Sequence, residues 1–202
     1  MFRRRSFLKS SSLIAGGLIL PKLSFKSKKL NQKKLKIAVV GCGGRGTGAA
    51  VQALRADNNV ELVTLADAFK DRLEGSLNAI KDEFEGEMEI NIKEKNKFVG
   101  FDAYKKAIDK SDVVILASPP GFRPAHFEYA INKNKHVFME KPVATDAHGV
   151  RQVLNSARKA KEKNLNVVVG LQRRYQKSYL SAKKQIDRGM IGKIISAHVR
   201  WN

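Results

Sequence analysis

Short apolar runs alternate with longer helical patterns along most of the chain. Residues 37–40 form a continuous apolar run, as expected of a parallel strand buried on both faces. Comparable runs predict further strands at residues 60–66, 97–101, 113–117, 136–139 and 167–169. Between them we expect a helix ending near residue 55 and helices at about 70–84, 103–110, 124–133 and 146–163. Asp102 is expected to cap the third of these helices. The alternation predicts an α/β fold with a doubly wound parallel sheet.

The last segment has a different pattern. After a helix expected at residues 178–188, apolar and polar residues alternate from Ile195 to Trp201. A period of two is typical of a strand with one buried face in an antiparallel or mixed sheet. We therefore expect the first strand of a second, α+β domain, with the rest of that domain missing.

Basic residues concentrate at the amino terminus. The net charge is +20, and residues 1–36 hold eleven Lys or Arg and no acid. Farther along, single basic residues alternate with acids, without a basic stripe or interleaved aromatic residues. This distribution indicates a Lys-rich solvated surface, so we expect no nucleic-acid partner.

The amino terminus resembles an export signal. Arg4 and Arg5 precede a short apolar run at residues 13–20, which Pro21 ends. A charged segment followed by an apolar one is typical of a signal peptide, and the paired arginines resemble the twin-arginine signal. We expect the twin-arginine export machinery as a partner, and a location in the periplasm or on the outer side of the membrane as an anchored protein. Cleavage and retention of the signal both stay open, and the alternative is a disordered basic tail.

Residues 41–46, the glycine loop, match the pattern G-x-G-x-x-G directly after the first apolar run. In that context Gly41 permits a tight turn, Gly43 lets the backbone approach a pyrophosphate, and Gly46 lets helix and sheet pack closely. Free N–H groups at the helix start would hold the phosphates. The loop predicts a site for NAD or NADP, with a purely structural turn as the alternative. The loop residues assigned to the cofactor are Gly41, Cys42, Gly43, Gly44, Arg45 and Gly46.

Two side chains near the glycine loop refine this prediction. Asp67 ends the second strand, 21 residues after Gly46, where a carboxylate is expected to accept hydrogen bonds from the adenosine ribose. Its charge favours NAD over NADP, although Lys70 and Arg72 lie just downstream; the alternative role is a helix N-cap. Cys42 is the only cysteine and cannot form an internal disulfide. We expect it to be a small side chain near a phosphate, with a reactive thiol as the alternative.

Polar clusters follow three other strands. Ligands of doubly wound sheets bind beyond the carboxyl ends of the strands, so we expect these clusters to converge on one edge. Each cluster alone would be unremarkable in a loop. The clusters are Ser118-Pro119-Pro120, Glu140-Lys141-Pro142 and Gln172-Arg173-Arg174. None of the motifs indicates a metal ligand set, so we predict no metal site.

These motifs together resemble a known family. Residues 135–142, the glycine loop, and Ser118-Pro119-Pro120 followed by His126 are similar to the glucose-fructose oxidoreductase, inositol dehydrogenase and rhizopine-catabolism (Gfo/Idh/MocA) family. The resemblance covers residues 36–202, which corresponds to the family's cofactor domain and the beginning of its second domain. The twin-arginine pair suggests the exported branch of the family.

The resemblance implies roles for particular residues. Lys141 would lie beside the nicotinamide and the substrate carbinol, where an ammonium can hydrogen-bond the reacting oxygen; the alternative is a surface lysine before a turn proline. Glu140 would orient the loop or the nicotinamide ribose, and the Lys141–Pro142 peptide is a candidate cis bond. His126 would be a helix residue packed near the cofactor rather than a catalyst. The positions that the resemblance assigns to cofactor contact are Ser118, Pro119, Pro120, His126, Glu140, Lys141, Pro142, Gln172 and Arg173.

The resemblance also implies an activity and an organisation. The protein would be an NAD(P)-dependent oxidoreductase that transfers a hydride between nicotinamide and a sugar, polyol or related hydroxyl compound. The family's remaining catalytic residues come from the second domain, which also forms homo-oligomers, so this chain is expected to bind cofactor but turn over little substrate. The alternatives are an NAD-dependent glycosidase of the same family and a non-catalytic nucleotide-binding module. The expected parts are a signal and linker (1–35), a dinucleotide-binding Rossmann domain (36–172) and the start of a truncated substrate domain (173–202).

Overall fold

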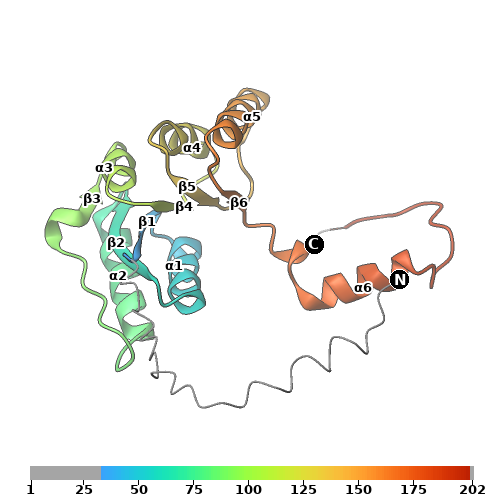
Figure 1. Ribbon diagram of the computed structural model, residues 1–202, viewed down its shortest axis with the longest axis horizontal. Helices are drawn as coiled ribbons and strands as arrows, with labels where there is room; N and C mark the ends of the chain where they lie inside the picture. The colour runs from blue at the N-terminus through green and yellow to red at the C-terminus, as the bar shows by residue number, and fades with distance from the viewer. Residues whose placement is uncertain (1–32, 201–202) are drawn as a thin grey trace, which may run out of the picture. The chain divides into compact units, whose positions relative to one another are not determined.

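Strands and helices alternate through residues 33–200, the part of the chain that the computed structural model describes (Figure 1). The strands are β1 (Leu35–Val40), β2 (Val60–Asp67), β3 (Lys97–Val99), β4 (Val113–Leu116), β5 (His136–Met139) and β6 (Val167–Val169). The α-helices are α1 (Gly44–Ala56), α2 (Lys70–Glu83), α3 (Ala103–Asp109), α4 (Arg123–Asn132), α5 (Ala147–Glu162) and α6 (Lys177–Asp187). Two short 3₁₀ turns are η1 (Glu94–Asn96) and η2 (Gln172–Arg174).

The strands form one parallel sheet in the order β3-β2-β1-β4-β5-β6. β1 pairs with β2 on one side and with β4 on the other, so the winding of the chain reverses between β1 and β4. In sheets of this kind, ligands bind beyond the carboxyl ends of the strands at that reversal. The predicted doubly wound α/β fold is confirmed.

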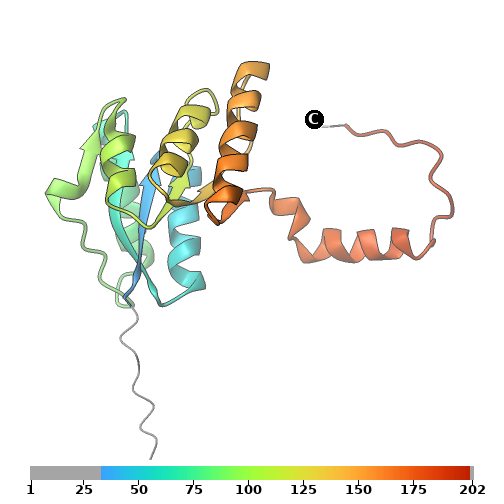
Figure 2. The same ribbon diagram turned by 45° about the horizontal axis from the view of Figure 1, so that its top comes forward.

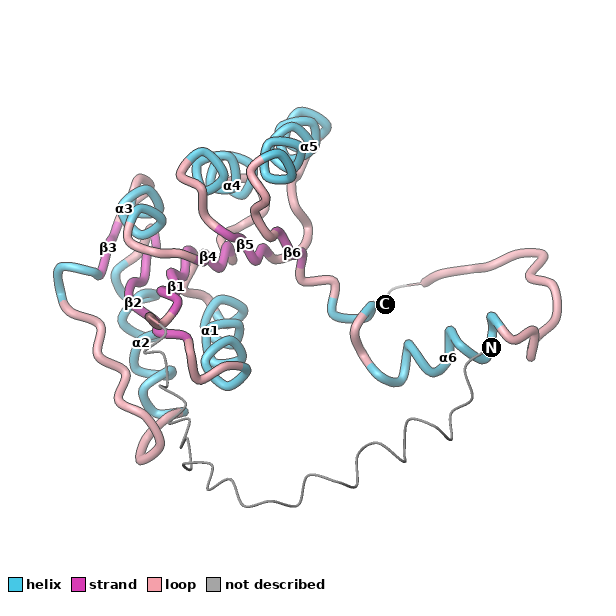
Figure 3. Tube along the Cα trace, viewed as in Figure 1, coloured by secondary structure: helices cyan, strands magenta, loops and turns pink. Residues whose placement is uncertain are grey.

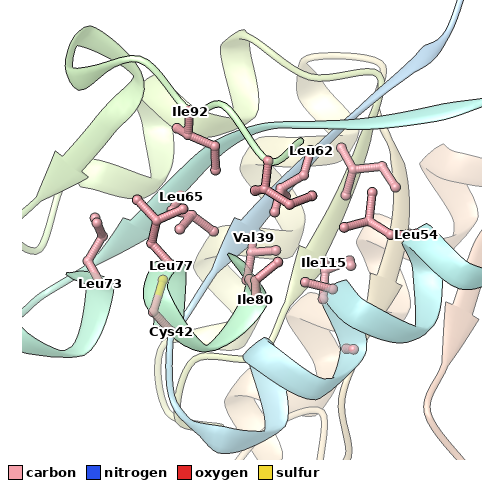
Figure 4. Close-up of a cluster of buried hydrophobic side chains, with 14 of the residues drawn as sticks. Val39, Cys42, Leu54, Leu62, Leu65, Leu73, Leu77, Ile80, Ile92 and Ile115 are labelled. Atoms are coloured by element: carbon pink, nitrogen blue, oxygen red, sulfur yellow. The ribbon is translucent and has the colours of Figure 1, made fainter. Parts of the chain in front are cut away.

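Helices cover both faces of the sheet, as Figures 1 and 2 show. On one face α1 and α2 pack over a buried cluster that includes Leu65 and Leu77 (Figure 4). On the other face α3, α4 and α5 pack over a second cluster that includes Phe127. Within β1, Val39 belongs to the first cluster and Val40 to the second. The unbroken apolar run therefore reflects burial on two faces.

Aspartates occupy the N-cap positions of α3 and α5, of which the sequence predicted Asp102, but only Asp146 caps with its side chain. The Asp146 carboxylate accepts a hydrogen bond from the Gly149 N–H at 2.6 Å, at the start of α5. Asp102 precedes α3 without a side-chain cap bond. Its carboxylate instead pairs with the Lys105 ammonium at 2.7 Å, one turn along the helix. The expected capping bond of Asp102 is therefore wrong.

The strand expected at residues 195–201 is not formed within the described residues. Residues 195–200 lie in a loop and are exposed (Figure 3), and α6 buries none of its side chains. A strand needs a neighbour to accept its backbone hydrogen bonds, and within residues 33–200 no strand pairs with this segment. Trp201 and the export signal expected within residues 1–32 lie outside the described residues. None of the described helices has the length and apolar character needed to cross a membrane.

Candidate functional site

A cleft of about 610 Å³ opens at the carboxyl edge of the sheet, lined by the loops that follow β1, β2, β3, β4 and β5. It lies at the reversal between β1 and β4, where this fold class binds ligands. The structure thus brings together most of the residues that the sequence assigned to the site. Those that line the cleft are Gly41, Gly43, Arg45, Asp67, Ser118, Pro119, Pro120, His126, Glu140 and Lys141.

Other predicted residues do not line this cleft. Cys42 and Gly44 face a neighbouring groove between α1 and α2. Gly46 packs against the Gly41 carbonyl group, and the Pro142 carbonyl oxygen accepts a hydrogen bond from Arg123, as described below. Gln172 and Arg173 lie in η2 and are exposed, and the Arg173 guanidinium stacks over the Tyr179 ring at 4.8 Å. The list of predicted residues outside the cleft is Cys42, Gly44, Gly46, Pro142, Gln172 and Arg173.

Two glycines of the glycine loop are required by the protein's own packing. Gly41 has φ +96°, and a Cβ there would lie 2.3 Å from the Ser118 nitrogen. A Cβ on Gly46 would lie 1.9 Å from the Gly41 carbonyl oxygen. The loop, the start of α1 and the loop after β4 therefore approach each other more closely than any side chain allows.

Gly43 has no such internal reason to be glycine. Its backbone angles, φ −75° and ψ 179°, suit any residue, and a Cβ there would have no atom within 4 Å. The open space borders the start of α1, where Gly43 offers no side-chain cap and the first turn holds no acid. The N–H groups of a helix start attract anions. The space left by Gly43 lets an anionic group such as a phosphate approach these N–H groups.

Asp67 connects the end of β2 to the glycine loop. Its carboxylate accepts hydrogen bonds from the Cys42 N–H at 2.6 Å and from the Phe69 N–H at 3.0 Å. The N-cap of α2 is Phe69, so the alternative role of Asp67 as that N-cap is excluded. A carboxylate offers about four acceptor positions, which leaves capacity for ligand hydroxyls on the cleft side.

The Cys42 side chain points into the core instead of toward the phosphate space. It is 3% exposed, its thiol lies 3.5 Å from the Ala66 carbonyl oxygen, and Figure 4 shows it among Leu65, Leu73 and Leu77. Burial, together with the nearby Asp67 charge, raises the pKa of the Cys42 thiol to about 12. A thiol that stays protonated is a poor nucleophile, which argues against the reactive alternative. The expected position beside a phosphate is corrected to a core position.

Residues 140–142, the lysine turn, follow β5 and contribute Glu140 and Lys141 to another wall of the cleft. Lys141 is exposed and lines the cleft, and among the described residues no hydrogen bond or ion pair engages its ammonium. The Lys141–Pro142 peptide is cis, which confirms the expectation from the family resemblance. An unengaged ammonium at the edge of a cleft is available to a bound ligand.

Glu140 anchors this turn to the glycine loop. It is 7% exposed and forms an ion pair with the Arg45 Nε at 2.8 Å. A Cβ on Gly170 would lie 3.0 Å from both Glu140 carboxylate oxygens, so the chain after β6 passes directly against this carboxylate. Arg45 also donates to the Gln52 side-chain oxygen at 2.9 Å. Residues 95 positions apart in the sequence thereby join the two walls of the cleft.

His126 is packed beneath the cleft. Its ring stacks on Tyr104 with centroids 4.1 Å apart, and its Nδ1 lies 3.0 Å from the Ser118 hydroxyl oxygen. Burial, with a smaller effect of the Arg123 charge, lowers the pKa of His126 to about 4. The imidazole is neutral at ordinary pH and its Nδ1 is occupied. This agrees with a packing role.

The sequence reasoning missed several residues that line the cleft. Arg123, at the start of α4, is 3% exposed and donates to the carbonyl oxygens of Ser118 and Pro142. Phe101 and Phe122 stack at 6.0 Å on loops after β3 and β4, and both are substantially exposed. Large aromatic side chains in the loops just past strand ends are the signal that could have revealed this lip. Within residues 33–200, no cluster of three or more His, Cys, Asp or Glu could hold a metal.

The chain is similar to dehydrogenases of known sequence and structure. Residues 35–170 match the family described as "Oxidoreductase family, NAD-binding Rossmann fold". Inositol 2-dehydrogenase of Salmonella typhimurium is 29% identical over 169 residues, which are 82% of this chain and 45% of that protein. The chain thus spans a little under half the length of the curated relatives that it matches along most of its length.

Solved structures agree with this relationship. Myo-inositol 2-dehydrogenase from Lactobacillus plantarum superimposes with a TM-score of 0.63 and 31% identity, over 81% of this chain and 44% of that one. Scyllo-inositol dehydrogenase from Lactobacillus casei, with bound NAD(H) and scyllo-inositol, gives a TM-score of 0.62 at 26% identity, over 80% of this chain and 43% of that one.

Proposed function

The chain belongs to the Gfo/Idh/MocA family of oxidoreductases with an NAD-binding Rossmann fold, and from this premise we propose that it binds NAD for hydride transfer. The whole protein would be an NAD(P)-dependent oxidoreductase that acts on a CH–OH group of a sugar, polyol or related compound. One observation carries the proposal: Gly43, with its open space, and Lys141, whose ammonium has no partner among the described residues, line the same cleft.

The cleft offers complementary groups for each part of the dinucleotide. The start of α1 beside Gly43 would hold the pyrophosphate, and Asp67 would accept hydrogen bonds from the adenosine ribose. Phe101 and Phe122 supply an apolar lip. The Asp67 charge opposes a 2′-phosphate, while Arg72 also lines the cleft and would attract one. NAD is therefore favoured and NADP is the second candidate.

Lys141 would assist the oxidation of the substrate hydroxyl. A bound nicotinamide would supply the hydride acceptor. The Lys141 ammonium would donate a hydrogen bond to the reacting oxygen and stabilise the negative charge that develops there, while the base that accepts the hydroxyl proton would come from the second domain. Glu140, buried against Arg45, would hold the backbone of the lysine turn. The unengaged lysine also argues against a non-catalytic nucleotide-binding module, because pure binding needs no ammonium at this wall.

The relatives favour a cyclic polyol or sugar as the substrate class, since several of them are inositol dehydrogenases. An NAD-dependent glycosidase, which would oxidise its substrate transiently, is the second candidate function. The remaining substrate-binding groups and the contacts of a homo-oligomer would come from a second domain.

Purification of the full-length protein tests the function directly. Mass spectrometry of the released ligand should identify NAD, and a panel of sugars and polyols should produce absorbance from reduced nicotinamide. Glycoside cleavage without net reduction would favour the glycosidase. A protein that neither retains nor binds a nicotinamide nucleotide would overturn the proposal.

Export by the twin-arginine route is a separate part of the proposal. It is supported by Arg4 and Arg5 ahead of the apolar run at residues 13–20. Because that route carries folded proteins, the cofactor could be loaded in the cytoplasm. Cell fractionation of the protein with both arginines replaced by lysine is the test. Retention in the cytoplasm is expected, and an unchanged distribution would contradict the export signal.

A further inference from the structure

Arg123 is an unusual residue for its position. It is the only Lys or Arg among the buried residues of the described chain, at 3% exposed. Within that part of the chain, no carboxylate forms an ion pair with it. Burial lowers the pKa of its guanidinium, while the nearby Glu140 charge raises it. Burying a charge without a paired carboxylate costs free energy, so the hydrogen bonds of this guanidinium must serve the structure or the function of the protein.

The guanidinium connects two loops. Nη1 donates to the Pro142 carbonyl oxygen in the lysine turn, and Nη2 donates to the Ser118 carbonyl oxygen after β4. The planar fork of an arginine can donate to two acceptors at once in a fixed geometry, which a lysine ammonium does not reproduce. Arg123 thereby ties the turn that follows β5 to the loop that follows β4.

This contact acts on the turn that carries Lys141. The Lys141 side chain has no partner of its own among the described residues, so its position depends on the backbone of the turn. On the amino-terminal side, the Glu140 N–H donates to the Leu116 carbonyl oxygen at 3.0 Å. On the carboxyl-terminal side, the contact of Arg123 with Pro142 holds the turn.

We propose, on the basis of the function proposed above, that Arg123 is a positioning residue for Lys141. By binding the Pro142 and Ser118 carbonyl groups together, it fixes the lysine turn against the loop after β4. The Lys141 ammonium is thereby held where the reacting hydroxyl binds. Arg123 itself has no part in proton or hydride transfer.

A positioning role and a merely structural role predict different results in the full-length protein. Arg123→Ala should lower kcat by roughly 10²-fold, the effect of a misplacement of about 1 Å, while NADH affinity stays close to that of the unchanged protein. Arg123→Lys should recover little of the loss, because one ammonium cannot bridge both carbonyl groups. Millimolar guanidinium should restore part of the turnover of Arg123→Ala and none of that of Lys141→Ala. The matched control is Arg158→Ala, an exposed arginine on α5, which should change nothing.

A second measurement needs no activity. Competitive acetylation of nucleotide-free protein, read by mass spectrometry, reports the reactivity of the Lys141 amine as a function of pH. Arg123→Ala should shift that profile for Lys141 and leave exposed lysines such as Lys161 unchanged. If Arg123→Ala does not fold, Arg123→Lys is compared in the same way.

Several results would overturn the proposal. Unchanged kcat, an equal loss of kcat and NADH affinity without guanidinium rescue, or an unchanged Lys141 profile would each do so. If the unaltered protein bound no nicotinamide nucleotide, the proposed function would fail. The acetylation profile would then still decide whether Arg123 positions Lys141.

Discussion

The two walls of the cleft are held by different kinds of contact. The glycine loop is held by its own backbone, because the missing Cβ atoms of Gly41 and Gly46 let the strand, loop and helix approach each other. The lysine turn is held by side chains from distant parts of the chain, with Arg45 contacting Glu140 and Arg123 contacting the Pro142 carbonyl oxygen. The first wall is local in sequence and the second is assembled by the fold.

This difference suggests that one wall binds the nucleotide and the other acts on the reacting group. Backbone N–H groups at the start of α1 are suited to hold a phosphate in a fixed position. An exposed ammonium on a tethered turn is suited to act on a reacting group, but only while its tethers hold. Nucleotide binding and turnover should therefore be separable by substitutions on the two walls.

The largest separation is expected from Lys141→Ala. Removal of the ammonium should lower kcat by roughly 10²-fold or more, the usual contribution of a group that assists proton transfer. NADH affinity should be retained, because the glycine loop is untouched. Steady-state kinetics and NADH fluorescence titration of the full-length protein measure the two effects. Lys161→Ala, an exposed lysine on α5, is the control. Normal turnover of Lys141→Ala would remove this residue from its role.

A smaller effect is expected within the glycine loop, where Gly46 is needed for packing and Gly43 leaves space for a ligand. Gly46→Ala places a Cβ 1.9 Å from a backbone oxygen, so it should lower the free energy of unfolding by about 1–3 kcal/mol despite the better helix propensity of alanine. Gly43→Ala meets no protein atom within 4 Å and should cost about 0.5 kcal/mol at most, while weakening NADH binding.

Urea denaturation and NADH titration of the cofactor-free protein measure these two substitutions side by side. Equal stability of the two variants would show that the close approach at Gly46 is not needed for folding. Unchanged NADH affinity in Gly43→Ala would show that the space beside it does not receive the nucleotide.

The local wall could be predicted from residue spacing alone, whereas Glu140, Lys141 and Pro142 were reached through a strand end and the family resemblance. The spacing of Gly41, Gly43 and Gly46 after an apolar run is sufficient to predict a strand, a turn and a helix start. Asp67 can be predicted because an acidic residue is expected about 20 residues after the glycine loop, at the end of the second strand, in such folds. Arg123 could not be predicted, because its partners are two backbone carbonyl groups that only the folded chain brings together.

The places where the sequence pattern and the structure differ have the same physical origin. The period-two pattern at residues 195–201 predicts a strand, but a strand depends on a partner that residues 33–200 do not supply. Gln172 follows a strand end, but it lies in the exposed η2 outside the cleft, and its contact with the cofactor stays a prediction. Cys42 was placed beside the phosphate by its neighbours in sequence, whereas its side chain joins the core. In each case a local pattern predicts a contact that depends on the whole fold.

The smallest expected effect concerns the ion pair that joins the two walls. The Arg45 Nε and the Glu140 Oε1 lie 2.8 Å apart. The side chain of the arginine is 47% exposed and that of the glutamate 10%. Solvent screens such a pair, so a double-mutant cycle of Arg45→Met and Glu140→Gln should give a coupling of about 1 kcal/mol in stability. The comparison pair is Arg55 and Glu83, 2.6 Å apart and 53% and 44% exposed, which joins α1 to α2 and should couple more weakly.

Turnover distinguishes the two pairs more sharply than stability does. If the pair of Arg45 and Glu140 links the phosphate-binding wall to the lysine turn, either single substitution should lower kcat, and the double variant should be little worse than the singles. The corresponding variants of Arg55 and Glu83 should leave kcat unchanged. Additive losses in the first cycle would mean that Arg45 and Glu140 act separately. The glycine loop and the lysine turn would then line one cleft without affecting each other.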